Sequence, residues 1–202
     1  MSNEIPKSTG TTSPTGTETI MSPTSLNESP KLSLSTDGVP AWVKPDLNRL
    51  LRVEHLEGDF AARSISLVDL PAGAIFARIT TATPATCAYS SVQASRDLHI
   101  ELNSDLVYTN HSCRPNLIFD MQKWEVRVNP ALKAGLKAGD ELTFFYPSTE
   151  WHMSQPFDCR CQEKQCLGRI TGAKDMPNEV LSQYWLNPHI EELLKQNYAE
   201  EP

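Results

Sequence analysis

Asn110-His111-Ser112-Cys113-Arg114-Pro115-Asn116 is the stretch of sequence that decides the fold of this chain. Further along lies Gly139-Asp140-Glu141-Leu142-Thr143-Phe144-Phe145-Tyr146, and after it Cys159-Arg160-Cys161-Gln162-Glu163-Lys164-Gln165-Cys166. The first segment is polar and holds one cysteine, the second is an apolar run that ends in tyrosine, and the third is rich in cysteine. Without an export signal, such closely spaced cysteines favour metal binding over disulfides.

The three segments resemble, in this order, the NHSCxPN, GxELTxDY and closing cysteine motifs of the SET-domain family, best known as protein lysine methyltransferases. The resemblance covers roughly Pro40 to Ala173. It implies an α+β fold that is mostly β: a compact domain of short curved sheets, closed at its C-terminal end by zinc and followed by terminal helices.

The composition narrows the class of protein. The chain has 202 residues and a formal net charge of −7. This balance argues against a general nucleic-acid binder, which needs a basic face to displace counterions, but it suits a cationic peptide or amine substrate. No apolar run is long enough to span a bilayer, and the start lacks the pattern of a secretory signal. We therefore expect no membrane partner and a reducing compartment, the cytoplasm or the nucleus.

The chain divides into four predicted regions. Residues 1–38 are mostly Ser, Thr, Pro, Gly and Asn, and they cannot bury enough apolar surface to offset their chain entropy, so we predict disorder there. Residues 39–150 should form the SET-like domain and residues 151–173 the zinc segment. Residues 174–202 should form C-terminal helices.

Short apolar runs separated by turn residues predict a β-rich domain. Pro71-Ala72-Gly73 should form a turn between the first two runs. The predicted strands lie within residues 64–70, 74–79, 117–120, 125–128 and 142–146.

Two helices are expected in the last region. Residues 179–186 form a helical stretch. Asn187 and Pro188 suit the N-cap and the first helical position of a second helix over residues 190–197. Ile190, Leu193 and Leu194 have i, i+3, i+4 spacing and share one face of that helix, which should dock on the body of the domain.

Cys159, Cys161 and Cys166 supply three of the four soft ligands that a tetrahedral zinc ion requires. The resemblance assigns the fourth ligand to the cysteine of NHSCxPN, here Cys113. Closing this site would draw the cysteine-rich segment onto the NHSC segment. The alternative is four free thiols without metal. Cys87 is left over, and we expect it to be a small buried apolar residue.

The resemblance also implies a site for methyl transfer from S-adenosylmethionine. Tyr146 matches the family's closing tyrosine, whose hydroxyl orients the amine and helps manage its proton; the alternative is a strand tyrosine with a satisfied hydroxyl. Asn110 and His111 match residues that hold the adenosyl part of the cofactor. Phe157 and Leu167 flank the cysteines, and they would either face the cofactor or fill the core around the zinc.

Three departures from the family pattern bear on the reaction. Counting back from the Pro-Ala-Gly turn puts Ala61 and Arg63 where the family has a G-x-G motif beside the cofactor. Arg63 would place bulk and positive charge near a cationic sulfonium. Phe145 replaces the aspartate of ELTxDY. The span from Phe76 to Asn110 is short, although larger relatives carry substrate-recognition inserts there.

Two functions remain open from the sequence. The first is an S-adenosylmethionine-dependent N-methyltransferase acting on a protein lysine or a small-molecule amine. The second is a SET-derived protein that no longer transfers methyl groups, reused as a binding module or as an enzyme of small-metabolite synthesis such as a cyclase. The short length favours a small substrate over a nucleosome.

Overall fold

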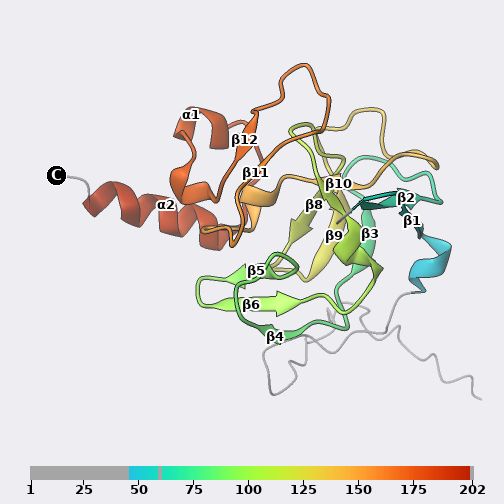
Figure 1. Ribbon diagram of the computed structural model, residues 1–202, viewed down its shortest axis with the longest axis horizontal. Coiled ribbons are helices and arrows are strands. Elements are labelled where there is room, and N and C mark those ends of the chain that lie inside the picture. Colours follow the sequence, from blue (N-terminus) through green and yellow to red (C-terminus); the bar gives the residue numbers. More distant parts are fainter. Residues whose placement is uncertain (1–45, 59–60, 201–202) are drawn as a thin grey trace, which may run out of the picture. The chain divides into compact units, whose positions relative to one another are not determined.

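The computed structural model describes residues 46–58 and 61–200. The predicted disordered region, residues 1–38, lies outside the described residues. The described part is mostly short antiparallel strands with few helices, which confirms the predicted α+β, mostly β fold class (Figure 1). None of its helices combines the length and the apolar character needed to cross a bilayer.

Two three-stranded antiparallel sheets form the centre of the domain. In one, the central strand pairs with a neighbour on either side in the order β3 (Ile75–Arg78), β9 (Glu125–Val128) and β8 (Leu117–Asp120). The other has the order β4 (Thr83–Ala85), β6 (Leu98–Glu101) and β5 (Val92–Ser95).

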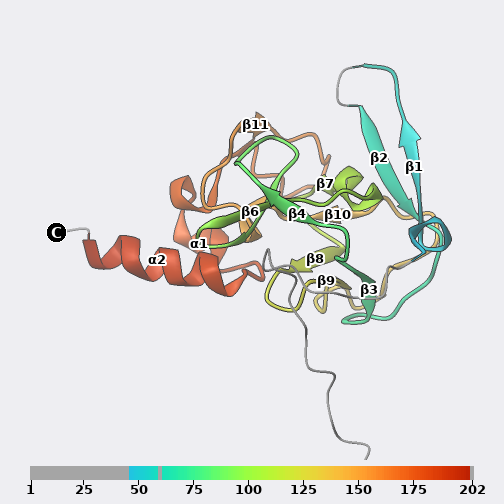
Figure 2. The same ribbon diagram turned by 90° about the horizontal axis from the view of Figure 1, so that it is seen from below.

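Three further strand pairs surround these sheets. Figure 2 shows the β1–β2 hairpin extending away from the sheets. Two of the pairs are antiparallel and one is parallel: β1 (Leu51–His55) with β2 (Ala62–Ser66), β11 (Phe157–Asp158) with β12 (Arg169–Ile170), and in parallel β7 (Asn110–His111) with β10 (Thr143–Phe144).

The main core lies between these sheets. Leu117, Phe119, Val126 and Val128 are fully buried, and Phe119 stacks on Phe144 with ring centroids 4.2 Å apart. Burying each such side chain contributes about 1.5–3 kcal/mol. Strands β8 and β9 coincide with the predicted runs 117–120 and 125–128, because strong apolar patterning and flanking polar residues mark both ends.

The β4–β6–β5 sheet was not predicted. Its strands fall in the span between Phe76 and Asn110, where polar residues interrupt the apolar pattern. Strand β4 includes Pro84 at an outer position of the sheet, where a missing N–H is tolerated. Cys87 follows this strand and is exposed, so its prediction as a buried residue is wrong.

The C-terminal helices differ in part from the prediction. The helix expected over residues 179–186 is only α1 (Asn178–Leu181), whereas the second helix begins at the predicted Pro188 and continues as α2 (Pro188–Glu200). Asn187 is fully buried between them. Its side-chain amide donates to the carbonyls of Phe119 and Ser148, and its oxygen accepts from the N–H of Met121, so it fastens the start of α2 to the sheet.

A second, smaller core joins these helices to the body. It contains Phe145, Ala173, Leu181 and Ile190, which confirms that α2 docks through the face carrying Ile190. Tyr184 stacks on Phe145 with ring centroids 3.7 Å apart. Phe145, which stands where the family pattern has aspartate, thus packs in this smaller core and contacts the C-terminal segment.

Candidate active site and metal centre

Strands β7 and β10 bring the first two sequence motifs side by side. They pair in parallel, with Asn110 opposite Thr143 and His111 opposite Phe144. Asn116 fastens the pair, since its side chain donates to the carbonyl of Glu141 (2.7 Å) and accepts from the N–H of Thr143 (2.9 Å). The final asparagine of the NHSCRPN segment thus fixes the position of the strand that leads to Tyr146.

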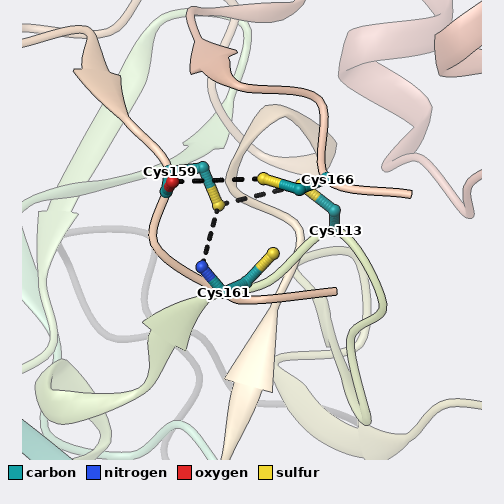
Figure 3. Close-up of side chains that lie close together, drawn as sticks. All are labelled: Cys113, Cys159, Cys161 and Cys166. Carbon is teal, nitrogen blue, oxygen red and sulfur yellow. Dashed lines mark hydrogen bonds between the residues drawn. The ribbon is translucent and has the colours of Figure 1, made fainter. Parts of the chain in front are cut away.

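The third motif closes over the first. Cys113, Cys159, Cys161 and Cys166 have their sulfur atoms within 4.8 Å of one another and directed toward a common space (Figure 3). The Sγ atoms of Cys113 and Cys159 are 3.8 Å apart. A disulfide would need about 2 Å, whereas zinc with Zn–S bonds of about 2.3 Å places tetrahedral ligands about 3.8 Å apart. The four cysteines therefore fit one zinc ion.

The surroundings of the thiols fit a metal as well. The N–H of Leu167 points at the Cys113 sulfur (3.4 Å) and that of Cys161 at the Cys159 sulfur (3.4 Å), as donors that stabilise thiolates. Burial raises the pKa of Cys113 to about 11, so this thiol does not ionise at neutral pH by itself. A divalent cation would supply the charge that the group lacks.

A cavity of about 1100 Å³ lies next to the cysteine cluster. Of the predicted site residues, Asn110, His111, Tyr146 and Phe157 line it, and Cys161 contributes to its wall. A cavity of this size can hold a cofactor together with a second small molecule. Chain folding thus gathers residues from β7, η3 (Tyr146–Ser148) and β11 around one space.

His111 connects the cavity to the cysteine cluster. Its Nδ1 accepts from the N–H of Tyr146 (3.2 Å), and its Nε2 lies 3.5 Å from the Cys113 sulfur. Burial lowers the pKa of His111 to about 4, so the ring is neutral and Nε2 carries the proton. In this arrangement both ring nitrogens of His111 are engaged, one by the Tyr146 backbone and the other beside the Cys113 sulfur.

Tyr146 is held from three sides. Its ring makes edge contacts with His111 and Phe157, and its hydroxyl donates to the carbonyl of Thr109 (3.2 Å). Burial raises the pKa of Tyr146, so its hydroxyl stays protonated at neutral pH. Thr109 also lines the cavity, and its buried Oγ1 has no hydrogen-bond partner within the described residues.

Arg63 also lines the cavity. Its guanidinium contacts Glu54 at 2.9 Å and Glu141 at 3.5 Å. Asn110 donates to the carbonyl of Ala62 (3.0 Å) and contacts the same Glu141 (3.2 Å). The positive charge expected to disfavour a sulfonium is therefore offset by two carboxylates, while its bulk stays at the cavity wall.

Leu167 differs from the other predicted cofactor residues. It is not among the residues that line the cavity. Its side chain packs against the smaller core, and its backbone N–H faces the Cys113 sulfur. This placement favours the alternative in which Leu167 fills the space around the zinc site.

Glu150 is a residue of the cavity wall that the sequence analysis did not predict. It is buried and lines the cavity one turn after Tyr146, and its N–H donates to the Tyr146 carbonyl. Burial raises the pKa of Glu150 to about 7. A glutamate in Ser-Thr-Glu-Trp has no pattern that marks it in the sequence. Its burial results from tertiary contacts. The N–H of Gln93 in β5 donates to the Glu150 carboxylate, and the N–H of Ala173 donates to the Glu150 carbonyl.

We predict that Glu150→Gln stabilises the protein at pH 8. The folded chain keeps the Glu150 proton up to about pH 7, whereas the unfolded chain loses it near pH 4.5, so stability falls as the pH rises between these values. The variant avoids this loss, and its free energy of unfolding should exceed that of the wild type by up to about 3 kcal/mol at pH 8 and by little at pH 5. Denaturant unfolding at both pH values measures the difference. An equal gain at pH 5 would contradict the charge explanation.

The sequence of this chain is similar to those of known methyltransferases. The chain is 54% identical over 157 residues to methyltransferase flvH of Aspergillus flavus, covering 77% of this chain and 87% of that protein. It is 39% identical over 75 residues to the histone-lysine N-methyltransferase ash1 of Drosophila melanogaster, covering 35% of this chain and 3% of that protein. The chain belongs to the SET-domain methyltransferase family. No protein-family model matches it.

A second partial relative supports the same conclusion. The H3 lysine-36 specific histone-lysine N-methyltransferase of Schizosaccharomyces pombe is 39% identical over 69 residues, which is 32% of this chain and 8% of that protein. The SET-domain histone methyltransferases thus match only a part of this chain, whereas flvH matches most of it. Four clustered cysteines able to hold a metal ion are consistent with the family's closing motif.

Proposed function

We propose that this SET-domain protein is an S-adenosylmethionine-dependent N-methyltransferase that acts on a protein lysine or a small-molecule amine. The observation that carries the proposal is the meeting of Asn110, His111, Tyr146 and Phe157 around one cavity beside the cysteine cluster. The relatives are methyltransferases by name. A zinc ion on the four cysteines would have a structural role, and the protein would act in the cytoplasm or the nucleus.

The cavity offers polar groups to such a cofactor. Asn110 and His111 would contact it, and Phe157 would pack on it. When bound, S-adenosylmethionine supplies an activated methyl group on a sulfonium. Tyr146 would orient the amine, since its protonated hydroxyl already points at a carbonyl on the cavity wall. Positioning of this kind supplies much of the rate in a displacement reaction.

The cavity of about 1100 Å³ has room for the cofactor and one small molecule together, which favours a small amine over a nucleosome as substrate. Several rim residues of the cavity are exposed, among them Arg114 and Arg160, so the entrance is lined by polar side chains. We therefore place a small-molecule amine first and a protein lysine second.

Calorimetry with S-adenosylmethionine on zinc-loaded protein tests the proposal. We expect one binding site per chain, with S-adenosylhomocysteine competing for it. Absence of heat at millimolar cofactor would reject the proposal and favour the alternative, a SET-derived protein that works without this cofactor.

We predict that Arg63→Gly combined with Ala61→Gly strengthens cofactor binding severalfold. The change removes bulk from the cavity wall and leaves Glu54 and Glu141 without their shared cation, which favours a sulfonium. Arg52→Gly is the matched control, because Arg52 also pairs with Glu54 but does not line the cavity. Calorimetry compares the dissociation constants. Weaker binding by the double variant alone would show that Arg63 helps to hold the cofactor.

A further inference from the structure

Glu150 differs from the other buried carboxylates of the described chain. Asp120 pairs with Lys123 at 3.1 Å, and Glu125 pairs with Arg127 at 2.8 Å, so each has a cation beside it. Glu150 is equally buried but has no lysine or arginine within 4.0 Å among the described residues. A buried carboxylate without a cation is costly, and such groups concentrate at functional sites.

The two oxygens of Glu150 have different surroundings. Oε1 accepts from the N–H of Gln93 (2.8 Å) and lies 3.1 Å from the Thr149 hydroxyl. Oε2 accepts no hydrogen bond from the described residues, and its nearest ionisable neighbour is Nδ1 of His99 at 4.0 Å. The carboxylate is therefore fixed through one oxygen, and the other is free to meet a ligand in the cavity.

Tyr146 and His111 are less suited than Glu150 to take a proton from a ligand. The Tyr146 hydroxyl donates to the Thr109 carbonyl, and the Nδ1 lone pair of His111 is engaged by the N–H of Tyr146. The other titratable groups around Glu150 are His99 of β6, the thiol of Cys87 and, behind Thr149, His189 of α2. Burial lowers the pKa of both histidines, so neither supplies a standing positive charge.

We propose that Glu150 is a catalytic residue that binds the substrate amine as its ammonium ion and accepts the proton that the amine must lose before methylation. This inference rests on the proposed methyltransferase function and specifies its substrate as an amine that enters the cavity protonated.

Proton transfer to Glu150 precedes the methyl transfer. A primary ammonium transfers one proton to Oε2 of Glu150 and becomes a neutral amine. The amine nitrogen then forms a bond to the methyl carbon while the carbon–sulfur bond breaks and its electron pair stays on sulfur. The product is a methylated ammonium ion, a neutral thioether and a protonated Glu150, which returns its proton to solvent. A carboxyl group whose pKa lies near 7 can both accept a proton from the ammonium ion and release it to solvent at neutral pH.

The binding test uses n-butylammonium as the probe, since it carries a primary amine that stays protonated below about pH 10, like lysine. Calorimetry is done on full-length wild type, Glu150→Gln and Glu125→Gln, each loaded with zinc and S-adenosylhomocysteine. Glu125→Gln is the matched control, because this buried carboxylate lies outside the cavity. At pH 8.5 we expect Glu150→Gln to bind the probe at least tenfold more weakly than the wild type and the control. Equal affinities would overturn the proposal.

The pH dependence gives a second readout that a structural role would not produce. Wild-type affinity for the probe should fall as the pH drops through about 7, because Glu150 becomes protonated, whereas Glu150→Gln should show no such change. Glu150→Asp is the control for a folding defect. It retains a titratable carboxyl group, so its affinity for n-butylammonium should still depend on pH. A pH-independent wild type would overturn the proposal.

The rate of methyl transfer from S-adenosylmethionine to n-butylamine, compared between wild type and Glu150→Gln, gives a third readout. Glu150→Gln should lower kcat/KM by about 100-fold at pH 7.5, and the deficit should shrink toward pH 10, where the free amine forms in solution. A deficit that is the same at every pH would overturn proton transfer. Failure of the methyltransferase proposal has a separate signature, namely no binding of S-adenosylmethionine by any of the variants.

Discussion

Replacement of Cys166 by serine should remove zinc from the protein and destabilise it strongly. Metal binding by such clusters is coupled to folding, with apparent binding free energies of about 10–16 kcal/mol for structural zinc. Here the cluster joins the β11–β12 hairpin to Cys113 of the NHSCRPN segment, so its loss frees one wall of the cavity. We expect the thermal midpoint to fall by about 10–20 °C. Elemental analysis should give about one zinc per wild-type chain.

Cys87→Ser is the matched control for this prediction. Cys87 is exposed and stands apart from the four clustered cysteines, so zinc content and the thermal midpoint should not change. A metal-free wild type with an unchanged midpoint would contradict the prediction, and so would a disulfide among the four cysteines. Addition of a chelator should reproduce the effect of Cys166→Ser.

Tyr146→Phe should lower the rate of methyl transfer by about 100-fold and leave cofactor affinity almost unchanged. The hydroxyl lies on the cavity wall against the Thr109 carbonyl and would act on the amine in the transition state. An interaction of this kind appears in kcat and not in ground-state binding. Single-turnover rates at saturating cofactor, together with calorimetry on the same protein, separate the two quantities.

Tyr108→Phe is the control for the loss of a tyrosine hydroxyl. Tyr108 ends η2 (Asp105–Tyr108), packs its ring on His55 and does not line the cavity. The control should keep the wild-type rate. A Tyr146→Phe variant with full activity would exclude the hydroxyl from the reaction. A variant that loses cofactor affinity in proportion to its rate would instead assign Tyr146 to cofactor binding.

The fold class and the metal cluster could be predicted because short motifs specify them. Cysteine has few roles other than metal binding or disulfides in such spacing, so Cys159, Cys161 and Cys166 indicate one site regardless of the remainder of the chain. Strands β8 and β9 were equally clear, since residues 117–119 form a continuous apolar run and residues 125–128 alternate between polar and apolar side chains. The domain boundaries at residues 38, 150 and 173 stay predictions, as do the roles of the individual site residues.

The β4–β6–β5 sheet could not be predicted, because its stability comes from pairing between distant segments. Pro84 and the polar side chains of β5 weaken the local signal, and the strands form only where neighbours satisfy their backbone groups. The early end of α1 has a similar cause. The buried Asn187 and the stacking of Tyr184 on Phe145 fix a compact turn where the sequence alone favours further helix.

The sequence by itself indicated the family and the four clustered cysteines, and it predicted Asn110, His111 and Tyr146 as residues of one site, since short motifs carry this information locally. Only the tertiary structure decided which carboxylates are exposed and which are buried. Glu54 and Glu141 meet Arg63 at the cavity wall, whereas Glu150 is enclosed without a cation. Burial and charge pairing depend on contacts between remote segments, and these two quantities set the pKa of a carboxyl group and thus its chemistry.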